Sequence, residues 1–231
     1  MITVETIRER HSVREYDGKP LSRAEFDAFI AVVEECTRES GLDIQLVGDN
    51  PEVFNVIARF GLIRGCRTHV AFVVDDAKAR GVAADEAIGY WGQKIVLAAQ
   101  DMGLNTCWCA LCSRKKSHAV VAPGKKIRLI IAVGHGETQG FSRKTKSVEA
   151  LSSVECAKAP AWFAAAMEAA QLAPTAMNNQ NFKITLLSDG KTVRIDAPQS
   201  GLNVIDEGIV RCNFEIAANE AGADWRWERD I

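Results

Sequence analysis

The sequence lacks a hydrophobic run long enough to cross a membrane. A membrane-spanning helix needs ~20 consecutive apolar residues, and the apolar runs in this 231-residue sequence are far shorter. The first five residues, Met-Ile-Thr-Val-Glu, also lack the basic segment followed by an apolar segment that marks a secretory signal. We therefore expect a cytoplasmic protein without a membrane partner.

An excess of charge of either sign is also missing. Lys and Arg together number 28 and Asp and Glu 30, which leaves a net charge of -2. Such a balance gives no electrostatic reason to expect a nucleic-acid partner. With 47% hydrophobic residues, the chain can bury a sizeable core, and its length allows one domain or two small ones.

Two common catalytic and cofactor motifs are absent. The sequence holds no G-x-S-x-G nucleophile motif, and none of its four histidines lies in one, so a catalytic triad is not supported. No G-x-G-x-x-G follows a predicted strand, so a nicotinamide dinucleotide, if one is used, is expected as a transient substrate.

The seven cysteines are better explained as reduced thiols than as a disulfide framework, because their number is odd and no export signal is seen. Cys107, Cys109 and Cys112, with His118, offer four soft ligands for zinc or an iron–sulfur cluster. Their C-x-C-x-x-C spacing fits neither type of site well. It favours the alternative, that these cysteines are small buried hydrophobic residues.

Hydrophobic periodicity and capping signals predict alternating helices and strands. Ser22 and Glu25 form a capping box before an apolar stripe, and Gly41 follows it as a terminator. Helices are expected at residues 3–11, 22–41, 84–102 and 162–172, and strands at 44–47, 69–74, 127–133, 182–187 and 192–195.

One pattern occurs twice. Gly89, Ala98, Ala99 and Gly103 recur at a constant offset as Gly208, Ala217, Ala218 and Gly222. Chance could produce one such match, but a helix leading into a strand also recurs in the same order, which favours an internal duplication. We expect a first half at residues 1–150 and a second at 151–231, together forming one compact unit.

Three segments carry candidate binding groups. Arg10, Ser12 and Arg14, with His11 between them, offer guanidinium groups and a hydroxyl suited to phosphate oxygens. The polar loop after the fourth predicted helix offers a hydroxyl, amides and turn residues suited to a neutral heterocycle. Its candidate residues are Pro174, Thr175, Ala176, Asn178 and Gln180. Arg143, Lys144 and Lys146 form a basic stretch.

Together these segments resemble the nitroreductase family. Residues 10–16 are similar to its R-[RH]-S-x-R-x-[FY] opening, residues 93–108 to its Q-N-[LI]-x-L-A-A-x-x-x-G-L-x-T-C-W run, and residues 173–182 to its A-P-S-x-x-N-x-Q-P-[WF] loop. Thr175 and Asn181 depart from the serine and proline of that loop. The resemblance implies an α+β fold with a central, mostly antiparallel sheet flanked by helices.

The resemblance also implies a cofactor and its contacts. FMN would be held by Arg10, His11, Ser12 and Arg14, by the basic residues Arg143, Lys144 and Lys146, by the loop residues Pro174, Thr175, Ala176, Asn178 and Gln180, and by backbone at Cys109, Ala110 and Leu111 near the flavin N5 edge. No general base is assigned, because the flavin carries the chemistry.

The function that the resemblance implies is hydride transfer from NAD(P)H through FMN to a nitroaromatic, a quinone or a flavin. Two alternatives stay open: a non-catalytic protein that binds and sequesters FMN, and a zinc-stabilised interaction module. Because the arginine segment occurs only in the first half and the loop only in the second, we expect a monomeric pseudo-dimer with one flavin site. A homodimer is the alternative.

Overall fold

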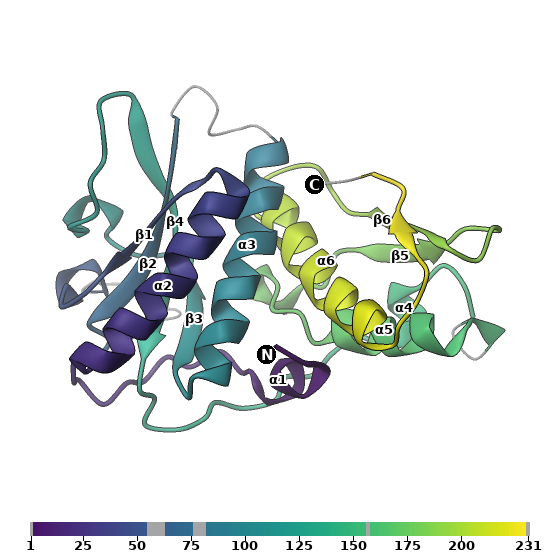
Figure 1. Ribbon diagram of the computed structural model, residues 1–231, viewed down its shortest axis with the longest axis horizontal. Coiled ribbons are helices and arrows are strands. Elements are labelled where there is room, and N and C mark those ends of the chain that lie inside the picture. The colour runs from purple at the N-terminus through teal and green to yellow at the C-terminus, as the bar shows by residue number, and fades with distance from the viewer. Residues whose placement is uncertain (1, 55–62, 76–81, 156–157, 230–231) are drawn as a thin grey trace. The chain divides into compact units, whose positions relative to one another are not determined.

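The computed structural model describes residues 2–54, 63–75, 82–155 and 158–229 (Figure 1). They form two compact units, each built from separate stretches of chain. Unit 1 comprises Met1–Glu9, Gly81–Lys94 and Arg143–Ile231, and unit 2 comprises Arg10–Arg80 and Ile95–Ser142. The proposed halves at residues 1–150 and 151–231 stay a prediction, because they refer to a repeat in the sequence rather than to these units.

Unit 2 is built on a four-stranded antiparallel sheet. Its strands are β1 (Asp43–Val47), β2 (Thr68–Asp75), β3 (Asn105–Cys109) and β4 (Lys125–Gly134), in the order β1-β2-β4-β3. The two central strands are apolar and almost entirely buried, whereas β3 is at one end of the order. Short 3-10 turns η1 (Pro51–Phe54) and η2 (Arg114–Lys116) complete this unit.

Helix α2 (Arg23–Ser40) runs across this sheet in Figure 1. The predicted capping box is present: Ser22 Oγ accepts from the Glu25 N–H, and a Glu25 carboxylate oxygen accepts from the Ser22 N–H at 2.8 Å. Gly41 ends the helix in the left-handed conformation, with φ 68°. The buried side chains Phe29, Val33 and Cys36 lie on one face, as the apolar spacing predicts.

Unit 1 is mainly helical. It contains α1 (Val4–Glu9), α4 (Val148–Leu151), α5 (Ala161–Gln171) and α6 (Asn203–Glu220), and α5 packs on α6 (Figure 1). A three-stranded sheet joins β5 (Lys183–Leu186), β6 (Thr192–Asp196) and β7 (Arg226–Trp227) in that order, with β5–β6 antiparallel and β6–β7 parallel. Helix α3 (Val82–Asp101) contributes its residues up to Lys94.

Within unit 1, α3 and α6 are in backbone contact at two glycines. A Cβ on Gly89 would lie 2.0 Å from the carbonyl oxygen of Ile205, and a Cβ on Gly208 would lie 2.0 Å from that of Glu86. Neither position has room for a side chain. Both glycines are corresponding members of the pattern that occurs twice in the sequence.

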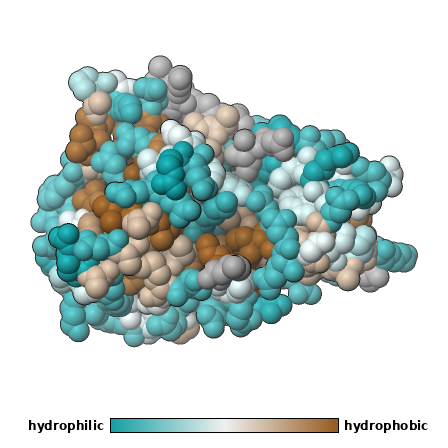
Figure 2. Space-filling view, in the orientation of Figure 1, coloured by the Kyte–Doolittle hydropathy of each residue, from teal (hydrophilic) through white to brown (hydrophobic). Residues whose placement is uncertain are grey.

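The predicted fold class is confirmed, and the predicted helices and strands agree with the structure to within a few residues. Four helices and strands were missed: the strands β3 and β7, the short helix α4, and the helix α6, which only the repeat hinted at. Among the described residues, no helix combines the length and the apolarity that a membrane span requires. Figure 2 shows apolar surface interspersed with hydrophilic side chains on the face in view.

Candidate functional site

The predicted phosphate-binding segment, residues 10–14, runs along the β3 end of the sheet in unit 2. Ser12 forms a parallel bridge with Thr106 on β3, and the Val13 N–H donates to the Thr106 carbonyl at 3.0 Å. Val13 is buried. Because successive side chains of extended backbone point to opposite sides, Ser12 and Arg14 face away from the core, while Arg10 is itself 9% exposed.

The chain that follows β4 packs on this segment. His11 Nε2 lies 3.0 Å from Ser142 Oγ, and a Cβ on Gly140 would come within 2.8 Å of the His11 Cβ. Asn105 supports the turn, because its Oδ1 accepts from the Gly136 N–H at 2.9 Å. The basic stretch therefore begins directly after a residue that contacts the arginine segment.

The residues expected near the flavin N5 edge lie at the end of β3. Cys109 is buried, and the carbonyl of Ala110 accepts from Arg114 Nη2 at 2.8 Å. Leu111 comes next with 67% of its surface exposed. The strand thus ends in a fixed turn that exposes an apolar side chain.

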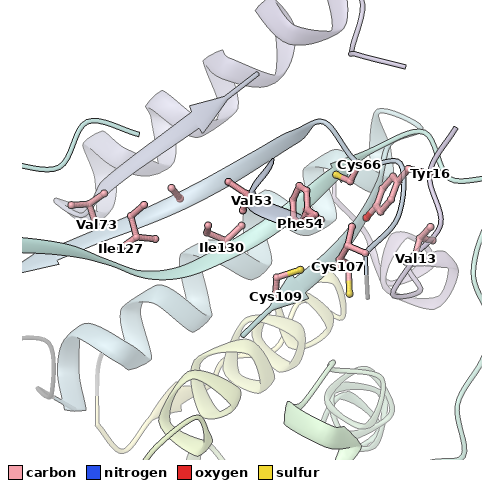
Figure 3. Close-up of a cluster of buried hydrophobic side chains, with 13 residues drawn as sticks. Val13, Tyr16, Val53, Phe54, Cys66, Val73, Cys107, Cys109, Ile127 and Ile130 are labelled. Atoms are coloured by element: carbon pink, nitrogen blue, oxygen red, sulfur yellow. The ribbon is translucent and has the colours of Figure 1, made fainter. Parts of the chain in front are cut away.

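Three of the cysteines form a buried cluster with Tyr16 in unit 2 (Figure 3). Burial raises the pKa of Cys66 to about 12. Hydrogen bonding to Cys107, followed by burial, raises the pKa of Cys109 well above its usual range. Such thiols stay neutral at physiological pH, and neutral thiols are poor nucleophiles.

Within the described part of the chain, no group of three or more His, Cys, Asp or Glu side chains is placed to hold a metal ion. None of the six cysteines described there forms a disulfide. Cys112 is only partly buried, and its Sγ lies 3.7 Å from the carbonyl oxygen of Cys109.

In unit 1 the basic stretch is bonded to the predicted flavin loop, residues 174–180. The Lys146 N–H donates to Gln180 Oε1 at 2.6 Å, and Lys146 Nζ donates to the Gln180 carbonyl at 2.9 Å. Asn178 Nδ2 donates to the Lys144 carbonyl at 2.8 Å, and Gln171 Nε2 donates to that of Lys146 at 2.7 Å. The two segments that the sequence analysis linked to FMN are thus one bonded structure.

The flavin loop holds an unusual backbone conformation. It contains the 3-10 turn η4 (Ala176–Asn178) and three non-glycine residues with positive φ: Met177 at 53°, Asn178 at 57° and Gln180 at 45°. Such conformations cost of order 1–3 kcal/mol each and persist only where surrounding contacts enforce them. Here the Gln180 N–H donates to Thr175 Oγ1 at 3.0 Å, and Gln180 Nε2 donates to the Gln171 carbonyl at 2.8 Å. The loop is therefore held in a fixed shape, with Met177 88% exposed at its tip.

Asp206, in the first turn of α6, holds the other end of the loop. Its two carboxylate oxygens accept from the Ala176 N–H at 2.9 and 3.0 Å. The side chain is buried, and burial raises its pKa to about 7, although the Ala176 N–H acts in the opposite direction. This pKa lies in the range where a group titrates under physiological conditions.

The sequence model of the family described as "putative TM nitroreductase" matches residues 2–218. The chain belongs to this family. No curated protein matches it. The matched range includes every candidate residue named above.

Solved structures agree on the fold of this nitroreductase-family chain. A structure from Thermotoga maritima described as a putative nitroreductase has a TM-score of 0.70 at 20% identity, covering 100% of this chain and 90% of its own. A putative nitroreductase in complex with FMN from Desulfovibrio desulfuricans and a putative NADH dehydrogenase/NAD(P)H nitroreductase from Parabacteroides distasonis each have a TM-score of 0.50. Their identities are 20% and 21%, and each comparison covers 66% of this chain and 95% of the other.

The predicted residues of this family member are divided between the two units. Unit 2 contains the arginine segment and the turn after β3, and unit 1 contains the basic stretch and the flavin loop. Sequence reasoning missed three residues that shape these parts: Asn105, Gln171 and Asp206. Asn105 lies in the family's G-L-x-T-C-W run at its variable position, and Asp206 gave no signal, because its partner is 30 residues away in the sequence.

Proposed function

We propose that this chain binds FMN and uses it to pass hydride from NADH or NADPH to a small electron-poor acceptor, such as a nitroaromatic, a quinone or a flavin. The observation that carries the proposal is membership of a nitroreductase family over residues 2–218. The FMN named in the Desulfovibrio title and the NAD(P)H in the Parabacteroides title support the cofactor and the donor.

The residues of unit 2 suit the phosphate end of FMN. The phosphate carries close to two negative charges, and guanidinium groups bind it with paired hydrogen bonds. Arg14 and the Ser12 hydroxyl lie on the side of the extended segment away from buried Val13, where they can meet a ligand. Arg10 is fixed by burial, so little side-chain entropy is lost when it binds.

In unit 1 the loop suits a neutral ring system and its ribityl chain, and the cations of the basic stretch suit a phosphate. Lys146 uses one of its three N–H donors on the Gln180 carbonyl, which leaves donors for a ligand. The amides of Asn178 and Gln180 are engaged within the unit, so we propose that they set the loop's shape, while Pro174, Thr175 and Ala176 present backbone and hydroxyl groups.

FMN, when bound, supplies the hydride and electron chemistry itself. The protein's own task is to fix the cofactor, orient its ring and keep one face open to donor and acceptor. A rigid loop serves this task because preorganised groups lose less free energy on binding. Leu111, exposed at the end of β3, would offer apolar surface to an aromatic acceptor.

Anaerobic mixing of the FMN-loaded protein with NADH and with NADPH tests the proposal. We expect one or both to bleach the long-wavelength absorbance of the flavin, and an added quinone or nitroaromatic to restore it. Bound flavin that neither nucleotide bleaches would contradict the proposal and support a protein that only sequesters FMN. Cys112→Ser, which leaves the candidate binding residues intact, should bleach like the wild type.

We also propose that the chain is a duplicated pseudo-dimer with a single flavin site. Each half has a helix, an antiparallel strand pair and a second helix: α2, β1–β2 and α3 in the first, and α5, β5–β6 and α6 in the second. In unit 2, β3 runs parallel to β2 with β4 between them, and β7 likewise runs parallel to β6 but pairs with it directly. These likenesses support a second copy that lacks the counterpart of β4.

A further inference from the structure

Asp206 is the side chain that fastens the beginning of the flavin loop to α6. Both of its oxygens face the N–H of Ala176, the first residue of η4. The other bonds described above join Asn178 and Gln180 to Lys144, Lys146 and Gln171, and they fasten the end of the loop. Of the strained residues, 177 lies between these two attachments, and 178 and 180 form the second one, so the loop keeps its shape only while both hold.

The attachment at Asp206 depends on charge. An ionised carboxylate accepts an N–H bond about twice as strongly as a neutral group does. When the carboxyl group is protonated, one oxygen becomes a donor and no longer suits the Ala176 N–H. Because burial brings the pKa of Asp206 to about 7, both forms are populated near neutral pH.

We propose that Asp206 is a positioning residue whose ionised carboxylate keeps the loop in the shape that binds flavin, and whose protonation loosens it. The role assigned to flavin rests on the function proposed above, whereas the effect on the loop does not. Asp206 contacts neither the hydride donor nor the electron acceptor. It acts through Ala176 and the backbone that follows.

Charged groups elsewhere on α6 and on the basic stretch have partners of their own. On α6, Glu207 accepts from Arg229 at 3.0 Å, and Arg211 donates to Glu86 at 2.6 Å. From the basic stretch, Lys146 is bonded to the Gln180 carbonyl. Burial and the Ala176 N–H are the two causes that act on the pKa of Asp206, so its titration reports on its own bond to the loop.

The first arm of the test needs no flavin. The chemical shift of the Ala176 amide proton, followed by NMR in the flavin-free protein, should titrate with a midpoint near pH 7 in the wild type. Asp206→Asn is the matched variant, because it keeps the shape and one acceptor oxygen but cannot titrate. A flat Ala176 shift in the wild type, or the same titration in Asp206→Asn, would overturn the proposal.

The second arm measures the FMN dissociation constant from about pH 5.5 to about pH 8.5. The phosphate of FMN itself takes up a proton with a pKa of about 6, and Asp206→Asn reports that contribution alone. We expect the wild type to lose about fivefold more affinity at the acidic end than the variant does, since a charge-assisted bond is lost.

The outcomes separate the two proposals. Equal pH dependence of FMN binding in both proteins would overturn the positioning role toward flavin. No binding of FMN at any pH would count against the proposed function, while the Ala176 titration would still decide whether Asp206 controls the loop. Asp206→Ala, which leaves no acceptor, should speed solvent exchange of the Ala176 amide at every pH in a protein whose remaining spectrum is unchanged.

Discussion

Gly89 and Gly208 face each other where α3 and α6 meet: the Cα of Gly208 lies 3.0 Å from the place that a Cβ on Gly89 would occupy. Each glycine also lies against the backbone of the opposite helix, at Ile205 and Glu86. The contact is reciprocal, as expected if corresponding helices of two copies pair about a former twofold axis.

Replacing either glycine by alanine should destabilise the protein by ~3 kcal/mol, even though alanine favours a helix by ~1 kcal/mol. The added Cβ would meet backbone atoms that cannot move without separating the helices. Urea unfolding measures the loss. Gly48→Ala is the matched control with a smaller expected loss, because its Cβ would meet only the ring of Phe26, 2.9 Å away. Wild-type stability in both helix variants would show that the helices do not pack this closely.

The buried carboxylate of Glu86 should be essential to unit 1. Glu86 and Arg211 are each 1% exposed and 2.6 Å apart, and Arg229 also donates to Glu86 at 2.8 Å. Glu86→Gln would leave the Arg211 charge buried without its partner, at an expected cost of ~3–5 kcal/mol in the free energy of unfolding. Arg23→Ala, which breaks an ion pair with side chains 89% and 50% exposed, should cost at most ~1 kcal/mol. Equal losses would contradict this account of the cluster.

The stability of unit 2 should fall in acid because of His69. Burial, and to a lesser extent His118, lowers its pKa from 6.5 to about 4. Between pH 6.5 and about pH 4 the His69 side chain is therefore protonated in the unfolded chain but neutral in the folded protein. The free energy of unfolding falls as the pH falls through that range. The loss should be at most ~3 kcal/mol. Denaturant unfolding of His69→Phe should show a flatter pH dependence, whereas His118→Gln, at an exposed position, should keep most of the slope.

Local signals in the sequence predicted the elements that depend on local contacts. The capping box of Ser22 and Glu25 and the terminator Gly41 fixed the bounds of α2, because each acts within one helical turn. β3 was missed because the run from Asn105 to Cys109 shows no clear alternation. Its extended state comes from pairing with β4 along Ile130 to Gly134.

The candidate site could be predicted as a set of segments but not as an assembled structure. The motif identified Asn178 and Gln180 as polar residues, yet only the fold shows that their amides brace the loop through Lys144 and Gln171. Their contact with flavin stays a prediction. Asp206 could not be found from the sequence, because a buried carboxylate bonded to a distant N–H leaves no local pattern.

Arginine and cysteine variants distinguish a flavin site from a metal site. Arg10→Ala should weaken FMN binding by ~2–4 kcal/mol, since it removes a charge-assisted contact with a partly desolvated phosphate. Cys112→Ser should change it little. Fluorescence titration with FMN measures both, with circular dichroism to confirm that each variant is folded. The reverse ranking would favour a metal centre over the flavin site.

One chain should hold one FMN. The flavin released by heating the purified protein, after incubation with FMN and removal of the excess, can be identified and quantified by chromatography while light scattering gives the particle mass. We predict one FMN per chain on a particle near 25.2 kDa. Release of FAD, or of no flavin, would contradict the assignment of the cofactor, and two FMN molecules per chain would contradict the single site.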